Sequence, residues 1–94
     1  MIKIDGKEYT SLESAKDAIS TGSDIYITDE SMKILSAPNA ASIYLWNCQY
    51  LELIDAPKAK QIEAHFCDFL TDVIARDATI RTFDCRKYSG SYRG

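Results

Sequence analysis

The sequence lacks the long apolar segments that membrane and secreted proteins need. No run approaches the roughly 18 apolar residues of a membrane span, and the first ten residues, MIKIDGKEYT, contain no apolar stretch of a secretion signal. Cysteines number three, and an odd number fits a reducing compartment better than a disulfide framework. We therefore expect a protein without membrane contact that works in the cytoplasm.

Groups that carry catalysis, metal binding or phosphate binding are also scarce. His65 is the only histidine, no C-x-x-C pair of a zinc site occurs, and the four glycines form no phosphate-binding loop. The formal net charge is −3, whereas binding to nucleic acid needs a clustered basic face. These absences favour a protein that is not an enzyme, that needs no cofactor or metal, and for which nucleic acid is a disfavoured partner.

What the sequence does contain is a repeat. Cys48 and Cys67 lie 19 residues apart, and Cys67 and Cys85 lie 18 residues apart. The same step relates several other sets of residues, namely Ala40, Ala59 and Ala78; Ile25, Ile43, Ile62 and Ile80; Leu51, Leu70 and Tyr88; Leu35, Ile54 and Val73. Residues 33–51 align with 52–70 without a gap, and a one-residue deletion in the first copy puts Met32 in the leucine column. A fixed period of this kind is the sequence signature of a solenoid.

Within each unit the pattern resembles a known repeat family. Ala40-x-x-Ile43-x-Leu45-x-x-Cys48-x-x-Leu51 resembles the leucine-rich-repeat consensus in its cysteine variant, and the trailing I-x-A-P resembles short bacterial repeats with a leucine-proline pair. The resemblance covers about residues 24–88. The units are shorter than the family's, alanine replaces several leucines, and Glu30 stands where later copies have cysteine.

The period-two alternation of Ile43 and Leu45 predicts a short strand in each unit, and equal spacing predicts that the strands stack in parallel. We expect an α+β protein: a leucine-rich-repeat-like β-solenoid of about four rungs over residues 23–88. Pro38 and Pro57 disfavour a helix after the strand, so the returns are expected to be extended or 3₁₀. The cysteine thiols are expected to fill the turns and to meet backbone carbonyls there.

The two ends of the chain differ from the repeats. Residues 1–22 are expected to form a cap with a hairpin turning at Asp5-Gly6, then a helix that ends near Gly22. Thr10-Ser11-Leu12-Glu13 matches a capping box, with Thr10 as N-cap and Glu13 reaching back. Residues 89–94 are expected to form a flexible tail.

Candidate binding residues alternate with the core positions and therefore point outward from the predicted sheet. Large exposed aromatic side chains commonly mark a partner site, although stacked aromatics also stabilise a sheet without binding anything. The candidates are Tyr26, Tyr44, Trp46, Asn47, Glu63, His65, Phe66, Arg81, Phe83 and Asp84.

Two functions follow from these columns. The first is a module that binds a protein or protein complex and occludes its surface. By size and style it is analogous to phage-encoded inhibitors of bacterial defence complexes, anti-CRISPR proteins included, which would place it in the cytoplasm of a bacterial host. The second is a nucleic-acid-binding or nucleic-acid-mimicking regulatory protein that uses the basic tail from Arg86 or the acidic turns. A homodimer through the exposed sheet is also open.

Overall fold

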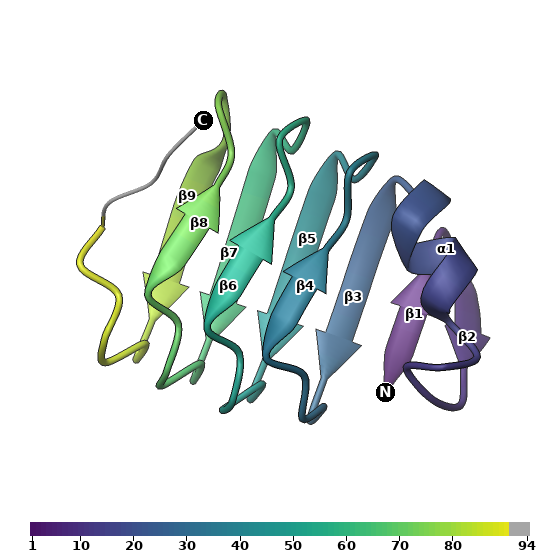
Figure 1. The fold of residues 1–94 in the computed structure, drawn as a ribbon, viewed down its shortest axis with the longest axis horizontal. Helices are drawn as coiled ribbons and strands as arrows, with labels where there is room; N and C mark the ends of the chain where they lie inside the picture. The colour runs from purple at the N-terminus through teal and green to yellow at the C-terminus, as the bar shows by residue number, and fades with distance from the viewer. Residues whose placement is uncertain (91–94) are drawn as a thin grey trace.

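The computed structural model describes residues 1–90 and shows a β-solenoid (Figure 1). The chain runs through nine strands and one helix, and successive turns stack side by side from the N-terminal cap to the C-terminal end. The bounds of the strands are β1 Ile2–Ile4, β2 Lys7–Tyr9, β3 Asp24–Thr28, β4 Ile34–Ser36, β5 Ser42–Trp46, β6 Leu53–Asp55, β7 Gln61–His65, β8 Asp72–Ile74 and β9 Thr79–Phe83, and the helix α1 spans Lys16–Thr21.

The strands form two sheets that face each other. The six-stranded sheet has the order β2-β1-β3-β5-β7-β9, and the three-stranded sheet has the order β4-β6-β8. All pairs from β3 onward are parallel and in the predicted register, so that Ile43 lies beside Ile62 and Ile62 beside Ile80. The returns are extended, one of the two forms expected. With four strands on one side and three on the other, the described residues make about three complete turns, fewer than the four rungs expected.

The core lies between the two sheets and is built from the repeated columns. Ile43, Leu45 and Leu51 of one turn are no more than 2% exposed, and Met32 is 8% exposed in the position predicted for the leucine column. The alanine columns let neighbouring turns approach closely, and Ala40 N–H donates to Ala37 O across the Pro38 turn at 3.2 Å. The periodicity of the sequence thus becomes a continuous apolar interior.

The N-terminal segment extends one sheet and covers the end of the core. The hairpin turns at Asp5 and Gly6, whose φ angles of 50° and 85° are typical of a type I′ turn. β1 pairs antiparallel with both β2 and β3, while α1 lies at the end of the other layer (Figure 1). Gly22 follows the helix because a Cβ there would lie 2.4 Å from Ile4 Cγ2.

The predicted capping box is wrong by one residue. Ser11 Oγ accepts from Ser14 N–H at 3.0 Å and Ser14 Oγ accepts from Ser11 N–H at 3.1 Å, and the helix begins at Lys16. The short hydroxyl of Ser14 makes the reciprocal bond that was assigned to Glu13. Of the predicted tail 89–94, residues 91–94 lie outside the described residues.

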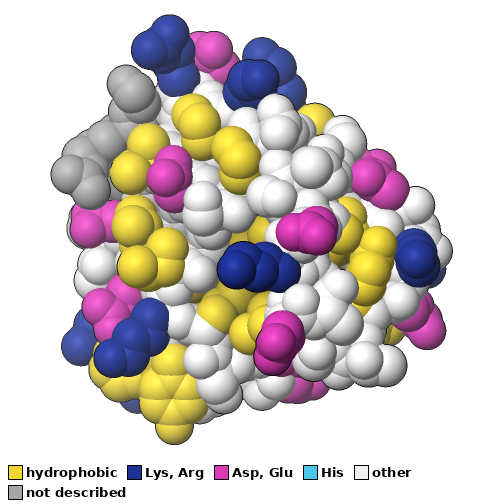
Figure 2. Space-filling view, turned by 45° about the vertical axis from the view of Figure 1, so that its right-hand side comes forward, with side chains coloured by type: hydrophobic (Ala, Val, Ile, Leu, Met, Phe, Trp, Pro, Cys, Tyr) yellow, Lys and Arg dark blue, Asp and Glu magenta, His cyan; other side chains and the backbone are white. Residues whose placement is uncertain are grey.

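Figure 2 shows the molecule from the side that includes the three-stranded sheet and the N-terminal cap. On this side the hydrophobic side chains lie in separate patches between charged and polar ones. Ile34 on β4 is 61% exposed there, although its neighbour Leu35 is 2% exposed. No helix among the described residues is long and apolar enough to cross a membrane.

The adjacent pair Leu35 and Ile34 provides a test of the core. Replacing Leu35 with alanine leaves a cavity between the sheets and should lower the free energy of unfolding by about 2–5 kcal/mol. Replacing Ile34, which points to solvent on the same strand, should cost less than about 1 kcal/mol. Urea denaturation followed by circular dichroism measures both, and equal losses for the two variants would contradict the assigned core.

Candidate functional site

The outer face of the six-stranded sheet carries the predicted columns as straight ladders. Tyr26 and Tyr44 pair in register and their rings stack 4.8 Å apart with 2° between the planes. Desolvation, the Tyr26 phenol and the Glu63 carboxylate all oppose ionisation of Tyr44 and raise its pKa above the ordinary value. The ladder continues through Glu63 and Arg81. Tyr44 therefore offers a neutral hydroxyl at this surface.

The next ladder forms what we call the aromatic stripe, made of Trp46, His65, Phe66 and Phe83. His65 lies between two neighbours, with ring centroids 4.9 Å from Trp46 and 4.5 Å from Phe83. Phe66 meets Trp46 edge-on at 5.1 Å. Trp46, Phe66 and Phe83 nevertheless remain 39%, 39% and 45% exposed. Stacking thus holds the rings in place without covering their outer surface.

His65 is also held by a carboxylate on its own strand. Its Nε2 donates to Glu63 Oε2 at 2.8 Å, and the two side chains are 18% and 34% exposed. Since Glu63 and His65 are two residues apart on β7, both point outward and can meet. This bond fixes the orientation of the imidazole in the centre of the aromatic stripe.

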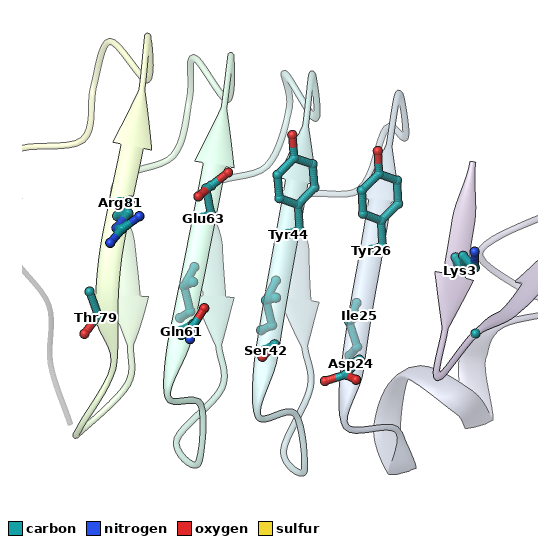
Figure 3. A pocket seen from close by; sticks show the side chains of 13 residues that line it. Lys3, Asp24, Ile25, Tyr26, Ser42, Tyr44, Gln61, Glu63, Thr79 and Arg81 are labelled. Carbon is teal, nitrogen blue, oxygen red and sulfur yellow. The ribbon is translucent and has the colours of Figure 1, made fainter.

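A groove runs across the same sheet beside the tyrosine ladder (Figure 3). Its volume is about 450 Å³, and it is bounded by the tyrosine ladder on one side and by a row of polar side chains on the other. That row consists of Asp24, Ser42, Gln61 and Thr79. The sequence analysis missed this row, although its residues precede the tyrosine ladder by two positions in every unit and therefore point outward by the same alternation.

A second omission lies in the turns after the strands. Tyr50 and Phe69 stack with ring centroids 6.3 Å apart and planes 6° from parallel, and Lys87 Nζ lies 4.5 Å above the Phe69 ring. Tyr50 and Phe69 are 57% and 42% exposed. The signal was present in the sequence, since these residues follow the 19- and 18-residue steps of the repeat.

The residues that end the four long parallel strands share a left-handed backbone conformation. Asp29, Asn47, Phe66 and Asp84 have φ angles of 59°, 57°, 56° and 57°. Asp and Asn tolerate this region, whereas a phenylalanine there is strained. Asn47 Nδ2 donates to Asp29 Oδ1 at 2.7 Å, so these two side chains also stabilise the turn. Phe66 is the exception to the ladder, and it contacts Trp46 instead.

The three cysteines occupy the position predicted for them. All are free and buried, and their thiols face backbone carbonyls, for example Cys85 Sγ to Ala64 O at 3.4 Å and Cys67 Sγ to His65 O at 3.5 Å. Hydrogen bonding to the two neighbouring thiols, together with burial, raises the pKa of Cys67. The same bonding from Cys67 lowers the pKa of Cys85 to about 6. In the first copy Glu30 takes this position and lies 3.5 Å from the N-terminal ammonium.

The strain at Phe66 leads to a prediction with an inverted sign. In an ordinary strand a glycine variant is less stable than the alanine variant by about 0.5–1 kcal/mol. At Phe66 we expect the opposite order, with Phe66→Gly more stable than Phe66→Ala by about 1 kcal/mol, because glycine adopts a positive φ freely. Phe83, an aromatic residue in regular β9, is the matched control and should show the ordinary order. Urea denaturation checks both pairs, and the ordinary order at Phe66 would refute the strain.

The cysteine ladder predicts selective thiol labelling. Cys85 is 9% exposed, against 0% for Cys48 and Cys67, and it has the lowered pKa. In the folded protein iodoacetamide should therefore modify Cys85 first, and this labelling should persist as the pH falls towards about 6 because the thiolate remains populated. Peptide mass spectrometry identifies the modified residue. Labelling of all three at equal rates would contradict the buried ladder.

Among residues 1–90 no three histidine, cysteine or acidic side chains lie together as metal ligands would. Comparison of the chain with protein-family models, curated proteins and solved structures gives no match. The function must therefore be argued from the ladders themselves.

Proposed function

We propose that this protein is a non-enzymatic module that binds another protein through the outer face of its six-stranded sheet. The observation that carries the proposal is Phe66. A large aromatic side chain occupies a strained left-handed position in which three equivalent turns have Asp or Asn, and it remains exposed against Trp46. Strain of this kind is retained where function requires the side chain.

The aromatic stripe has the composition of an interface centre. Trp and other aromatic residues are enriched among the side chains that dominate binding energy, and such anchors are surrounded by polar groups. Here the surrounding residues are Tyr26, Tyr44, Asn47, Glu63, Arg81 and Asp84. Because the rings are already stacked, little side-chain entropy remains to be lost on binding.

The dimensions of the face suit a protein partner. The molecule measures 31 × 24 × 17 Å along its principal axes, so that its broad side covers roughly 750 Å². A standard protein interface buries about 800 Å² on each partner. We infer that the module acts by covering a functional surface of its partner, with the groove beside the tyrosines as an additional contact.

The finer assignments are part of this proposal. The repeat is proposed to be leucine-rich-repeat-like on the grounds of its cysteine column and its I-x-L strands. The partner is proposed to be a subunit of a bacterial defence complex, with the protein acting as a phage-type, anti-CRISPR-like inhibitor. That assignment relies on the small size and acidity of the chain, and a partner's identity is what tests it.

The aromatic stripe can be tested with a double variant. Trp46→Ala combined with Phe83→Ala should abolish capture of the partner from bacterial lysate in an affinity pull-down read by mass spectrometry. Because both rings are exposed, the two changes together should cost only about 1–2 kcal/mol of stability. Ile34→Ala, an exposed apolar residue on the other sheet, is the control and should leave capture unchanged.

Two results would count against the proposal. Capture that survives the double variant would remove the aromatic stripe from the interface. Salt-sensitive binding of short DNA or RNA by the unmodified protein in fluorescence polarisation would instead favour the nucleic-acid alternative.

A further inference from the structure

The six-stranded sheet ends at β9, and this edge is built differently from the other one. At the N-terminal side the hairpin β1-β2 covers β3 with antiparallel strands. Among the described residues β9 pairs with β7 and with no strand on its other side. The second edge of the solenoid is therefore open in a way that the first is not.

The backbone groups that face the open side can be identified from the ladder. Thr79 N–H donates to Lys60 O, and Phe83 O accepts from Phe66 N–H, so these β9 residues turn their polar groups towards β7. Alternate residues of a parallel strand turn theirs to alternate sides. Ile80 and Thr82 consequently direct their N–H and C=O groups away from β7.

The side chains of the same two residues are incompletely covered. Ile62 and Ala64, their partners on β7, are 1% and 0% exposed. Ile80 and Thr82 themselves are only partly buried, because no further turn packs over them within residues 1–90. An added strand would satisfy the backbone groups and complete this end of the core.

Charge indicates what kind of strand fits. Residues 1–74 contain 6 basic and 12 acidic residues, whereas residues 75–90 contain 4 basic and 2 acidic ones, so a net charge of +2 is concentrated at this end. Arg81 lies in the middle of β9 on its outer face, and it makes no hydrogen bond or ion pair with any other residue in the range 1–90. Its neighbour Glu63 is bonded to His65.

The same charge disfavours a second copy of this chain as the occupant. Pairing of two β9 strands would bring two cationic ends and two Arg81 side chains together, and like charges across strands destabilise a sheet. Charged residues on edge strands commonly prevent such self-association. An acidic strand would turn this repulsion into attraction.

We propose that the β9 edge binds an extended acidic segment of a partner protein, which adds as a further strand with a carboxylate beside Arg81. Main-chain hydrogen bonds to Ile80 and Thr82 would supply affinity, and Arg81 would supply the preference for acid. This site is separate from the aromatic stripe, so it stands whether or not the proposed function does.

The test uses two blocked peptides, Thr-Val-Glu-Val-Thr and Thr-Val-Lys-Val-Thr, titrated to millimolar concentration into the ¹⁵N-labelled full chain. The glutamate peptide should shift the amide signals of Ile80 and Thr82, slow their hydrogen exchange, and bind about three- to tenfold more tightly than the lysine peptide. Arg81→Glu should reverse that order of affinity, and Arg81→Gln should abolish the preference.

Lys87→Glu is the matched control, because it makes the same charge change in the last turn but not on β9. It should leave the order of the two peptides unchanged. The proposal is overturned if neither peptide perturbs β9 at millimolar concentration, if both bind equally to the unmodified chain, or if Lys87→Glu reverses the order as Arg81→Glu does. An unchanged amide spectrum outside the last turn confirms that the variants are folded.

Discussion

In-register stacking of equivalent residues in successive turns is the constraint on which the other features of this molecule depend. Hydrogen bonds between parallel strands hold neighbouring backbones about 4.8 Å apart. The 18- and 19-residue spacing places the same side chain above its counterpart in each turn. Buried columns therefore become a core, and outward columns become ladders. A tyrosine pair with planes 2° apart is a direct consequence of this register.

The same stacking makes the exceptions informative. A column tolerates a residue type in every turn or in none, because the local backbone is repeated. Phe66 departs from the Asp and Asn residues that share its left-handed conformation, and it does so where Trp46 can contact it. Glu30 departs from the cysteine column, and there the N-terminal ammonium lies close enough to pair with it. One exception is explained by an intramolecular partner, and the other leaves an exposed ring.

A solenoid also has two ends, which the repeat itself cannot close. Here one end is closed by an antiparallel hairpin and a short helix, and the polarity of charge along the axis makes the other end distinct. The exposed aromatic stripe and the cationic β9 edge thus lie on neighbouring parts of one sheet. They share Phe83 and Arg81, which alternate along the same strand. A partner that covers the first can extend to the second.

The local order of this protein follows from its sequence, since a fixed period, an alternation of two and an Asp-Gly turn each act over a few residues. The parallel register, the extended returns, the buried thiols and the outward columns were predictable on that basis. The start of the helix was not, because Ser14 and Glu13 compete for one hydrogen bond and only the finished geometry decides between them. The groove beside Asp24 and Ser42, the left-handed strain at Phe66 and the open edge at Ile80 and Thr82 also needed the tertiary structure. Each of them depends on which neighbour a residue acquires in space, and the spacing of residues along the chain does not contain that information.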